Sequence, residues 1–389
     1  MKLIEFNAYK RLPLPVVGAE GCELVLEDGR RVLDLYGGHC VNTLGAGDRG
    51  LGEVLSWQWK RLSFATNLLD HAPRRAFMEA FERNLPPTPQ GAPAWEVFCS
   101  NSGAEANENA LKIALAATRR SKVVCFSGGF HGRTAAAAAV SDKKNKPFPA
   151  PPFEVVRVRW NDTGAAVAAI DGTVGAVILE PIQSLAGVTE PGPGFLEALR
   201  SACDEHGAAL VFDEVQTGSG RLGTHWASQH FGVAPDAFTT AKGAGGGLPI
   251  GLTVLRSDLA ARAPGDLLGS TFGGGPLVLA AAAEVARRIS GPGFLAQVRE
   301  TSAALRRAGL RGPIESVRGA GLLLGLVVRE GLTAAAVRDH LLKQGVLVGT
   351  SDDPRVVRLS PALTLAPREA ERLEQALESF EAAAAAAVR

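Results

Sequence analysis

The feature that most constrains the fold is an alternation of short apolar segments with helical segments between residues 95 and 256. The apolar segments are Trp95 to Cys99, Val123 to Phe126, Gly175 to Leu179 and Ala208 to Phe212. Their apolar residues run consecutively, as in strands that are buried on both faces. The helical segments between them include Ala104 to Arg119 and Gly194 to His206. This order predicts an α/β fold with a mostly parallel sheet, which places ligands at the carboxyl ends of its strands.

The chain of 389 residues is long enough for two lobes. We predict an N-terminal segment, 1–50, that contributes to a small domain, a large domain over 51–285, and a C-terminal small domain over 286–389. Gly291, Pro292 and Gly293 lie near the second boundary. A Glu- and Ala-rich segment from Arg368 to about Val388 predicts a final helix.

Charge and cysteine usage exclude several classes of protein. Lys and Arg number 41 against 40 acidic residues, so no basic surface for nucleic acid or anionic membrane is expected. The five cysteines are scattered and form no CxxC pair, which disfavours a disulfide framework or a zinc site. The histidines show no metal-ligand spacing, so we expect no metal. Without a signal peptide or a long apolar run, we expect a cytoplasmic protein.

Asp213 and Lys242 form the most informative pair of residues. Asp213 follows an apolar strand, and Lys242 lies 29 residues further along, after a second short strand and before the flexible run Gly243 to Gly247. A lysine in that place can form an imine with an aldehyde cofactor, and a buried carboxylate can keep a pyridine nitrogen protonated. Taken singly, each residue fits a structural role better, Asp213 as a cap of the next element and Lys242 as a surface charge.

Three further segments carry candidate ligand-binding residues. Ser100 to Asn107 lies between a strand and a helix, where free N–H groups can bind phosphate. The same segment also fits an ordinary capped helix, with Ser102 as N-cap and Glu105 as its partner. Gly128 to Arg133 offers an aromatic ring and a guanidinium for a carboxylate. Gly269 to Pro276 fits either a second phosphate loop or a cluster of turns.

Read together, these segments closely resemble the class III, or ω-, aminotransferases, and within that family the acetylornithine aminotransferase branch. The motifs that carry the resemblance span nearly the whole chain. They are VNTLG (41–45), SNSGAEANENALKIA (100–114), GGFHGRT (128–134), VILEPIQ (177–183), FDEVQTGSGRLG (212–223), TTAKGAGGGLPIG (239–251), STFGGGP (270–276), VRGAGLLLG (317–325) and VRLSPALT (357–364).

The resemblance implies pyridoxal 5′-phosphate (PLP) fold type I, like aspartate aminotransferase, with a large domain around a mostly parallel sheet and a smaller α+β domain. It implies that Lys242 forms the imine with PLP and shuttles the proton, and that Asp213 pairs with the pyridine nitrogen. The remaining implied cofactor contacts are Ser102, Gly103 and Ala104 at the phosphate, Phe130 on the ring, Gln216 at the hydroxyl side, and Thr271 at the phosphate of a partner subunit.

On the substrate side, the resemblance implies that Arg133 holds the α-carboxylate of the donor, with Ser270 nearby. Arg358 would bind the α-carboxylate of glutamate or 2-oxoglutarate, and Glu180 belongs to the same substrate side. The implied reaction passes the ω-amino group of N2-acetylornithine to 2-oxoglutarate in arginine biosynthesis. Because Thr271 would serve the neighbouring site, the resemblance also implies a homodimer.

The sequence departs from the family pattern on the substrate side. After VILEPIQ, relatives usually carry a glutamate that pairs with the second arginine, and Leu185 stands in its place. Relatives usually carry Phe-Tyr near Asn67, where this chain has Leu69 and Asp70. These changes leave the implied cofactor contacts intact and alter the expected selection of the donor.

Several alternatives therefore remain open for the substrate and the role. The donor could be succinylornithine, ornithine, 4-aminobutyrate or a lysine intermediate attached to a carrier protein. An aminomutase of the same fold would need no 2-oxoglutarate. A PLP-binding protein without turnover is disfavoured because Lys242, Asp213 and Arg133 occur together.

Overall fold

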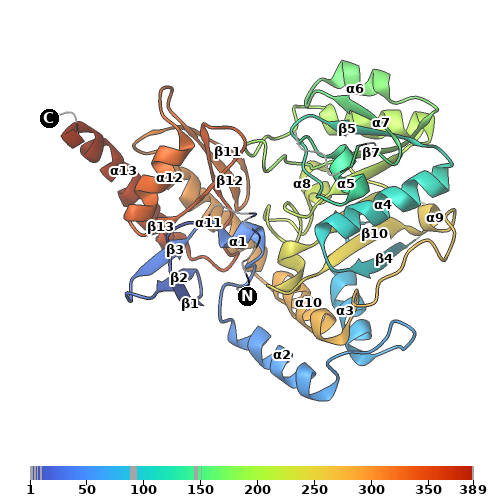
Figure 1. The fold of residues 1–389 in the computed structure, drawn as a ribbon, viewed down its shortest axis with the longest axis horizontal. Helices are drawn as coiled ribbons and strands as arrows, with labels where there is room; N and C mark the ends of the chain where they lie inside the picture. Colours follow the sequence, from blue (N-terminus) through green and yellow to red (C-terminus); the bar gives the residue numbers. More distant parts are fainter. Residues whose placement is uncertain are drawn as a thin grey trace.

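The computed structural model describes residues 3, 6, 8, 11–87, 94–143, 148–149 and 151–387. These residues form a larger lobe around one extended sheet and a smaller lobe with two small sheets (Figure 1). The N-terminal strands lie beside the C-terminal elements, so both ends of the chain build the smaller lobe (Figure 1).

The larger lobe contains a seven-stranded sheet in the order β4-β10-β9-β8-β7-β5-β6. Only β10 is antiparallel to its neighbours, so the sheet is mostly parallel, as predicted. Because β10 is antiparallel to both β4 and β9, the other six strands all run the same way. Their bounds are β4 Trp95–Ser100, β5 Lys122–Phe126, β6 Glu154–Val158, β7 Val174–Leu179, β8 Ala209–Asp213, β9 Ala237–Thr240 and β10 Gly251–Arg256.

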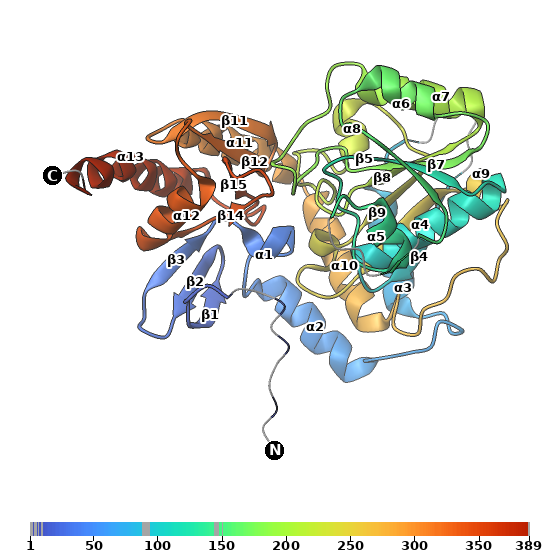
Figure 2. The same cartoon turned by 45° about the horizontal axis from the view of Figure 1, so that its top comes forward.

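Both faces of this sheet are buried, which explains the unbroken apolar runs in its strands. In β5, Val124 and Phe126 face one hydrophobic core while Val123 and Cys125 face another. Helices α3 (Ala72–Glu82), α6 (Thr163–Ala169), α7 (Phe195–His206) and α10 (Pro276–Ile289) contribute to the first core. Helices α4 (Gly103–Thr118), α5 (Ala135–Val140) and α9 (Ser257–Ala260) contribute to the second. In the turned view, α5 and α9 lie beside α4 (Figure 2).

The smaller lobe combines two four-stranded sheets with three helices. One sheet has the order β1-β2-β3-β13, and the other β11-β12-β15-β14. The strands are β1 Val16–Glu20, β2 Glu23–Leu26, β3 Arg31–Asp34, β11 Ile314–Ala320, β12 Leu323–Val328, β13 Val346–Leu347, β14 Gly349–Thr350 and β15 Val356–Leu359. The helices are α11 Phe294–Gly309, α12 Ala334–Lys343 and α13 Ala370–Ala387, preceded by the 3₁₀ turn η2 Pro367–Glu369.

The pairing of β3 with β13 supports the proposal that residues 1–50 contribute to the small domain. The proposed boundary at 285/286 falls inside α10, whose Ala286 packs in the core of the larger lobe. The turn Gly291 to Gly293 separates α10 from α11 and is the more natural place to divide the chain. The domain division itself stays a proposal.

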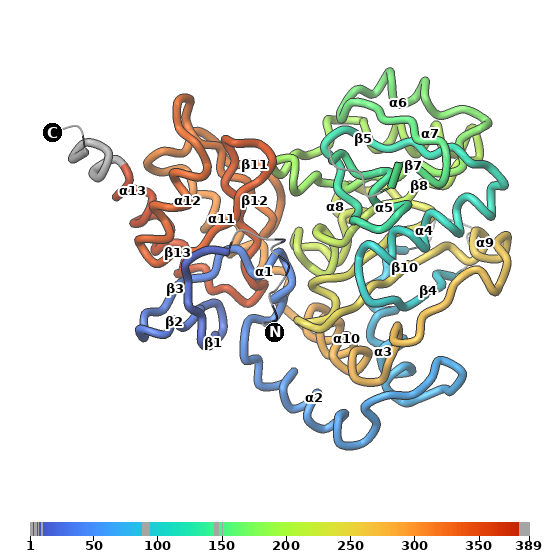
Figure 3. Tube along the Cα trace, viewed as in Figure 1, coloured from blue at the N-terminus to red at the C-terminus, as the bar shows by residue number. Residues whose placement is uncertain are grey.

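Most sequence-predicted elements are present with ends shifted by one or two residues. The strand predicted to end at Phe212 includes Asp213, and the final helix begins at Ala370, after η2. Val388 lies outside the described residues. Three elements connect the lobes or flank the central strands: α1 Gly37–Cys40, α2 Arg49–Arg61 and α8 Ala227–Phe231, whose paths are clearest in the tube (Figure 3). Across the described ranges, no helix has the length and apolar character that crossing a membrane requires.

Candidate active site

Five parallel strands end around one cavity of about 510 Å³. The carboxyl ends of β4, β5, β7, β8 and β9 lead directly into residues that line it. Nine of the predicted site residues lie there together, as expected for the ligand edge of a parallel sheet. They are Ser102, Gly103, Ala104, Phe130, Arg133, Glu180, Asp213, Gln216 and Lys242.

Lys242 follows β9 and begins the 3₁₀ turn η1, Lys242–Gly245. Its backbone has φ +36°, a left-handed conformation that costs a non-glycine residue energy and that is common at functional sites. Burial lowers the pKa of the Lys242 ammonium, because desolvation disfavours the charged form. The neutral amine, which is the nucleophilic and basic form, is therefore more available than on an exposed lysine.

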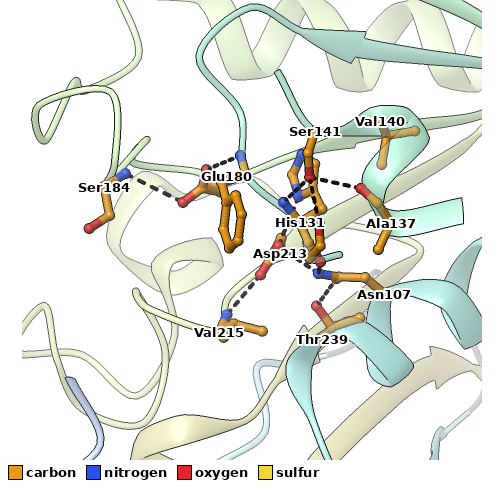
Figure 4. Close-up of polar contacts among 12 residues, drawn as sticks. Asn107, His131, Ala137, Val140, Ser141, Glu180, Ser184, Asp213, Val215 and Thr239 are labelled. Atoms are coloured by element: carbon orange, nitrogen blue, oxygen red, sulfur yellow. Dashed lines mark hydrogen bonds and ion pairs between the residues drawn. The ribbon is translucent and has the colours of Figure 1, made fainter. Parts of the chain in front are cut away.

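Asp213 is a buried carboxylate held by three donors (Figure 4). Its Oδ2 accepts hydrogen bonds from His131 Nδ1 at 2.8 Å and from Asn107 Nδ2 at 2.7 Å. Its Oδ1 accepts the N–H of Val215 at 3.0 Å. Thr239 donates to Asn107 Oδ1 at 2.6 Å and so fixes the orientation of the amide. These donors fix the orientation of the Asp213 carboxylate, which lines the cavity.

The segment Ser102 to Ala104 begins helix α4, and both readings of it hold together. Ser102 Oγ caps the helix by accepting the N–H of Glu105 at 3.2 Å. Glu105 accepts the N–H of Asn101 at 3.1 Å, one residue before the position that a strict capping box uses. The N–H groups of Gly103 and Ala104 have no carbonyl partner within the helix, so this end can bind an anion.

Gly103 is required here for a close approach. A Cβ at Gly103 would lie 2.9 Å from Val215 Cγ2, a contact that real Cβ atoms do not make. The start of α4 therefore packs tightly against the chain that follows Asp213. This contact keeps the free N–H groups and the carboxylate on the same cavity wall.

Phe130 and Arg133 come from the loop after β5. The guanidinium of Arg133 lies 5.4 Å from the centre of the Phe130 ring. Arg133 is exposed, and among the described residues no carboxylate forms an ion pair with it. It is therefore available for a carboxylate of a ligand.

Glu180 follows β7 and joins two parts of the cavity wall. Its Oε1 accepts the N–H of Phe130 at 2.8 Å, and its Oε2 accepts the N–H of Ser184 at 3.4 Å (Figure 4). Burial, with the negative charge of Asp213 as the next cause, raises the pKa of Glu180 to about 7. The predicted substrate-side residue thus orders the loop that carries Phe130.

Arg358, on β15, lies behind the cavity wall and does not line it. Its Nη1 donates to Ser184 Oγ at 2.8 Å, and Ser184 Oγ in turn donates to Oε1 of the cavity residue Gln216 at 3.2 Å. Cys40 Sγ is 3.5 Å from the same oxygen. Arg358 is therefore connected to the cavity through one hydroxyl group.

Ser270 and Thr271 line a second cavity of about 800 Å³, separate from that of Lys242. The carbonyl groups of Ser270 and Gly273 accept hydrogen bonds from Asn67 Nδ2 at 2.7 and 3.0 Å. Ser270 Oγ accepts a hydrogen bond from Asn101, a residue of the first cavity, at 3.2 Å. Within one chain, Thr271 is thus not brought to the Lys242 cavity.

Sequence reasoning gave no role to two polar residues of this region and did not predict the partner of a third, His131. His131 bonds to Asp213. Asn107 and Ser184 received no role, yet each joins two functional segments. The one available signal was that Asn107 lies among the apolar residues Ala106, Ala110 and Leu111 on the buried side of its helix.

The cavity residues fit PLP. A partly buried lysine with a lowered pKa, an oriented carboxylate and a helix start with free N–H groups line one cavity of suitable size for a cofactor. The close packing at Gly103 keeps the Asp213 carboxylate and the free N–H groups at the start of α4 on the same wall. This donor set matches the aldehyde, the pyridine nitrogen and the phosphate of that group.

Comparison with known proteins agrees with this chemistry. The family model described as aminotransferase class-III matches residues 6–384. An acetylornithine aminotransferase of Mycolicibacterium smegmatis is 40% identical over 96% of this chain and 95% of that protein. The chain therefore belongs to the class III aminotransferases, which are PLP-dependent, and its reaction requires an amino donor and a keto-acid acceptor.

Two solved structures share the fold. The N-acetylornithine aminotransferase of Stenotrophomonas maltophilia superimposes with a TM-score of 0.80 at 32% identity, covering 97% of this chain and 99% of the other. An ornithine aminotransferase of Toxoplasma gondii, which has PLP in partial occupancy at its active site, gives a TM-score of 0.86 at 27% identity, covering 95% of this chain and 92% of the other. PLP fold type I is thus confirmed.

Proposed function

We propose that this protein transfers the ω-amino group of N2-acetylornithine to 2-oxoglutarate. The observation that carries the proposal is the meeting of Lys242, Asp213 and Arg133 around one cavity, in a chain whose relatives include acetylornithine aminotransferases. Arg133 supplies a cationic contact for the α-carboxylate of the donor, and Lys242 supplies the amine that chemistry on the ω-carbon requires.

Each predicted cofactor contact has a place in this proposal. Lys242 would hold PLP covalently, Asp213 would face the pyridine nitrogen, and Gln216 the ring hydroxyl. The N–H groups at Gly103 and Ala104, with the Ser102 hydroxyl, would receive the phosphate, and Phe130 would cover the ring. When bound, PLP supplies an aldehyde that takes up the amino group and a pyridinium ring that withdraws electrons.

Different residues of the chain would then transfer the proton and position the groups around it. Lys242 Nζ, with its lowered pKa, accepts a proton from the substrate carbon and returns it at the next step. His131, Asn107 and Val215 donate to Asp213 and so fix the carboxylate that would face the pyridine nitrogen. Glu180 keeps the Phe130 loop in place through its N–H contact.

The donor assignment is tested by a spectrophotometric half-reaction. PLP-loaded protein is titrated with N-acetylornithine, and the absorbance of enzyme-bound PLP is followed. We expect that absorbance to fall and then to return on addition of 2-oxoglutarate, with glutamate released. If the absorbance changes only with another amine, that amine is the donor. If it changes with no amine, aminotransfer by this site is refuted.

We also propose that the protein acts as a homodimer in which Ser270 and Thr271 serve the neighbouring site. Their cavity is separate from that of Lys242, and the surface around it carries exposed apolar side chains. Phe272 is 68% exposed, and Phe64, Leu68 and Leu69 are exposed as well. Such a patch favours burial against another protein surface.

Sedimentation of the purified protein tests the dimer. We expect a dimer for the unmodified chain and a shift toward monomer for Phe272→Asp, together with weaker PLP retention. A monomer that binds PLP and turns over normally would contradict the shared site. The cytoplasmic location stays a prediction from the sequence.

A further inference from the structure

The side-chain amide of Gln216 is held at one end. Gln216 lines the cavity that Lys242 and Asp213 also line, and it is 8% exposed. Its Oε1 is 3.2 Å from the hydroxyl of Ser184 and 3.5 Å from the thiol of Cys40. Among the residues that the structure describes, no acceptor contacts its Nε2. Both partners of the amide therefore lie on the side of its oxygen.

The direction of the hydrogen bond between Ser184 and Gln216 follows from Arg358. A guanidinium can only donate, so Ser184 Oγ accepts the hydrogen bond from Arg358 Nη1 at 2.8 Å. The hydroxyl hydrogen of Ser184 then donates to the Gln216 amide. That contact requires the oxygen of the amide, because its nitrogen is a donor. The two N–H donors of Gln216 Nε2 are therefore left for the cavity.

Cys40 reaches the same oxygen from a strained backbone. Its φ is +68°, and the three residues before it also have positive φ. Such conformations are unfavourable for residues with a Cβ and persist where the surrounding structure imposes them, often at functional sites. Here Asp34 Oδ1 accepts the N–H of Tyr36 at 2.9 Å and that of Gly37 at 2.8 Å, which holds the turn. The strained turn brings the buried Cys40 thiol against Gln216.

The turn that carries Ser184 is also fixed by its packing. The carbonyl of Ser184 accepts the N–H of Val188 at 3.1 Å, and the carbonyl of Leu185 accepts the N–H of Asp352 at 2.8 Å. Val188 is fully buried and has φ +56°, an unfavourable value for a β-branched residue. Ser184 is itself fully buried. Because both donors to Gln216 lie on backbone that packing fixes, they orient the amide.

Titratable groups of both signs surround Gln216. Substituting Ser184 with alanine changes no charge among them, and serine and alanine are both neutral at position 40. A change in the pH dependence of the site in such variants therefore reports on hydrogen bonding. The groups are Lys242, Asp213 and Glu180 on the cavity wall, Asp34, Tyr36, His39 and Cys40 at the strained turn, and Arg358 and Arg221 behind them.

We propose that Ser184 and Cys40 are positioning residues that fix the Gln216 amide with its nitrogen toward the cavity, so that Gln216 acts only as a hydrogen-bond donor to the ring oxygen of the bound cofactor. This inference rests on the proposed function, in which Gln216 faces the ring hydroxyl. A fixed donor stabilises the ionised form of that oxygen. An amide free to rotate would present its own oxygen part of the time and lose this effect.

The pH dependence of the absorbance of bound PLP measures this donor. A donor to the ring oxygen weakens the hold of that oxygen on the proton of the Lys242 nitrogen, so the proton is lost at lower pH when the donor is present. We expect Gln216→Ala to raise the midpoint of the absorbance change by about one pH unit, the size of one charge-assisted hydrogen bond. The double variant Ser184→Ala, Cys40→Ala should raise it by a similar amount.

A double-mutant cycle tests whether Ser184 acts through Gln216. In a Gln216→Ala background, Ser184→Ala should leave the midpoint unchanged, because the amide that it orients is gone. Cys40→Ser, which keeps a donor, should shift the midpoint less than Cys40→Ala. Thermal unfolding establishes that each variant folds. If the double variant does not fold, Ser184→Ala alone enters the comparison, with a smaller expected rise.

The outcomes separate this inference from the proposed function. An equal rise on Ser184→Ala with and without the Gln216 amide would overturn the positioning role. An unchanged midpoint in the Ser184 and Cys40 variants, or in Gln216→Ala itself, would overturn it as well. Absence of reaction with every amine would refute the proposed function, while the absorbance of bound PLP would still decide how Gln216 is oriented.

Discussion

The proposed cofactor side and the proposed substrate side of the site differ in how their charged groups are held. On the cofactor side, Asp213 and Lys242 are placed by adjacent parallel strands, and the carboxylate is held by three donors. On the substrate side, Arg358 comes from the smaller lobe and contacts only neutral acceptors, while Arg133 is exposed. On the first side the Asp213 carboxylate is fully engaged by hydrogen-bond donors, whereas on the second side no described carboxylate pairs with either guanidinium.

This difference indicates which residues can be substituted without loss of stability. A buried network in which every donor and acceptor is used loses free energy when any one member is removed. The exposed guanidinium of Arg133 can be altered with little loss of stability, because its contact with a ligand would form only on binding. We therefore expect substitutions on the cofactor side to affect all substrates and those on the substrate side to discriminate among them.

The largest effect is expected for Lys242→Ala. Loss of the amine removes both the covalent attachment and the proton-transfer group, so the half-reaction should slow by about 10³-fold or more with every donor. Stopped-flow absorbance of the PLP-loaded protein measures this rate. Lys112→Ala, an exposed lysine on α4, is the matched control. Normal turnover of Lys242→Ala would refute the assignment of Lys242 as the residue that binds PLP and transfers the proton.

Arg133→Ala should discriminate sharply between donors. Loss of a bidentate, charge-assisted contact is expected to slow donors with an α-carboxylate by about a hundredfold and simple alkylamines far less. The ratio of the two half-reaction rate constants is the measurement, with Arg133→Lys as the charge-retaining control. Equal losses for both donor types would place Arg133 outside the substrate side.

His131→Ala should have a smaller effect that is independent of the donor. It leaves Asp213 Oδ2 with Asn107 as its remaining described donor, so we expect about a tenfold loss in rate. The pH dependence of the absorbance of bound PLP should also shift, because the carboxylate that would face the pyridine nitrogen loses one of its hydrogen bonds. His131→Asn, which keeps an N–H donor, should recover part of both. A loss of stability without any spectral shift would make His131 merely structural.

The smallest effect concerns stability rather than rate. Glu214, next to Asp213, is fully buried, and burial raises its pKa from 4.5 to about 7. The folded state therefore binds its proton more tightly than the unfolded state, and stability falls as pH rises from about 4.5 to about 7. Glu214→Gln should flatten the pH dependence of unfolding free energy by up to about 3 kcal/mol.

Chemical denaturation at pH 5, 6, 7 and 8 checks this expectation, with the exposed Glu197→Gln on α7 as the control. An unchanged slope in Glu214→Gln would mean that this carboxyl is already neutral or well solvated throughout that range.

Much of the larger lobe was predictable from local patterns. The strands with consecutive apolar residues and the capped start of α4 were predicted to within one or two residues. Burial of a strand on both faces and capping of a helix both depend on residues that are close together in the sequence. The bonding of His131 to Asp213 was not predictable, since 82 residues separate them and a lone histidine carries no spacing signal.

The family, the cofactor chemistry and the residues at the strand ends could be inferred from the amino-acid sequence, because each depends on short motifs in a fixed order. The groups that surround Arg358 could be identified only from the three-dimensional structure. Ser184 lies 174 residues away from it and Tyr36 lies 322 residues away, on segments that meet where the two lobes pack together. The burial of Arg358 and its hydrogen bonds to Ser184 and Tyr36 arise from the packing of the lobes, which no local sequence pattern predicts.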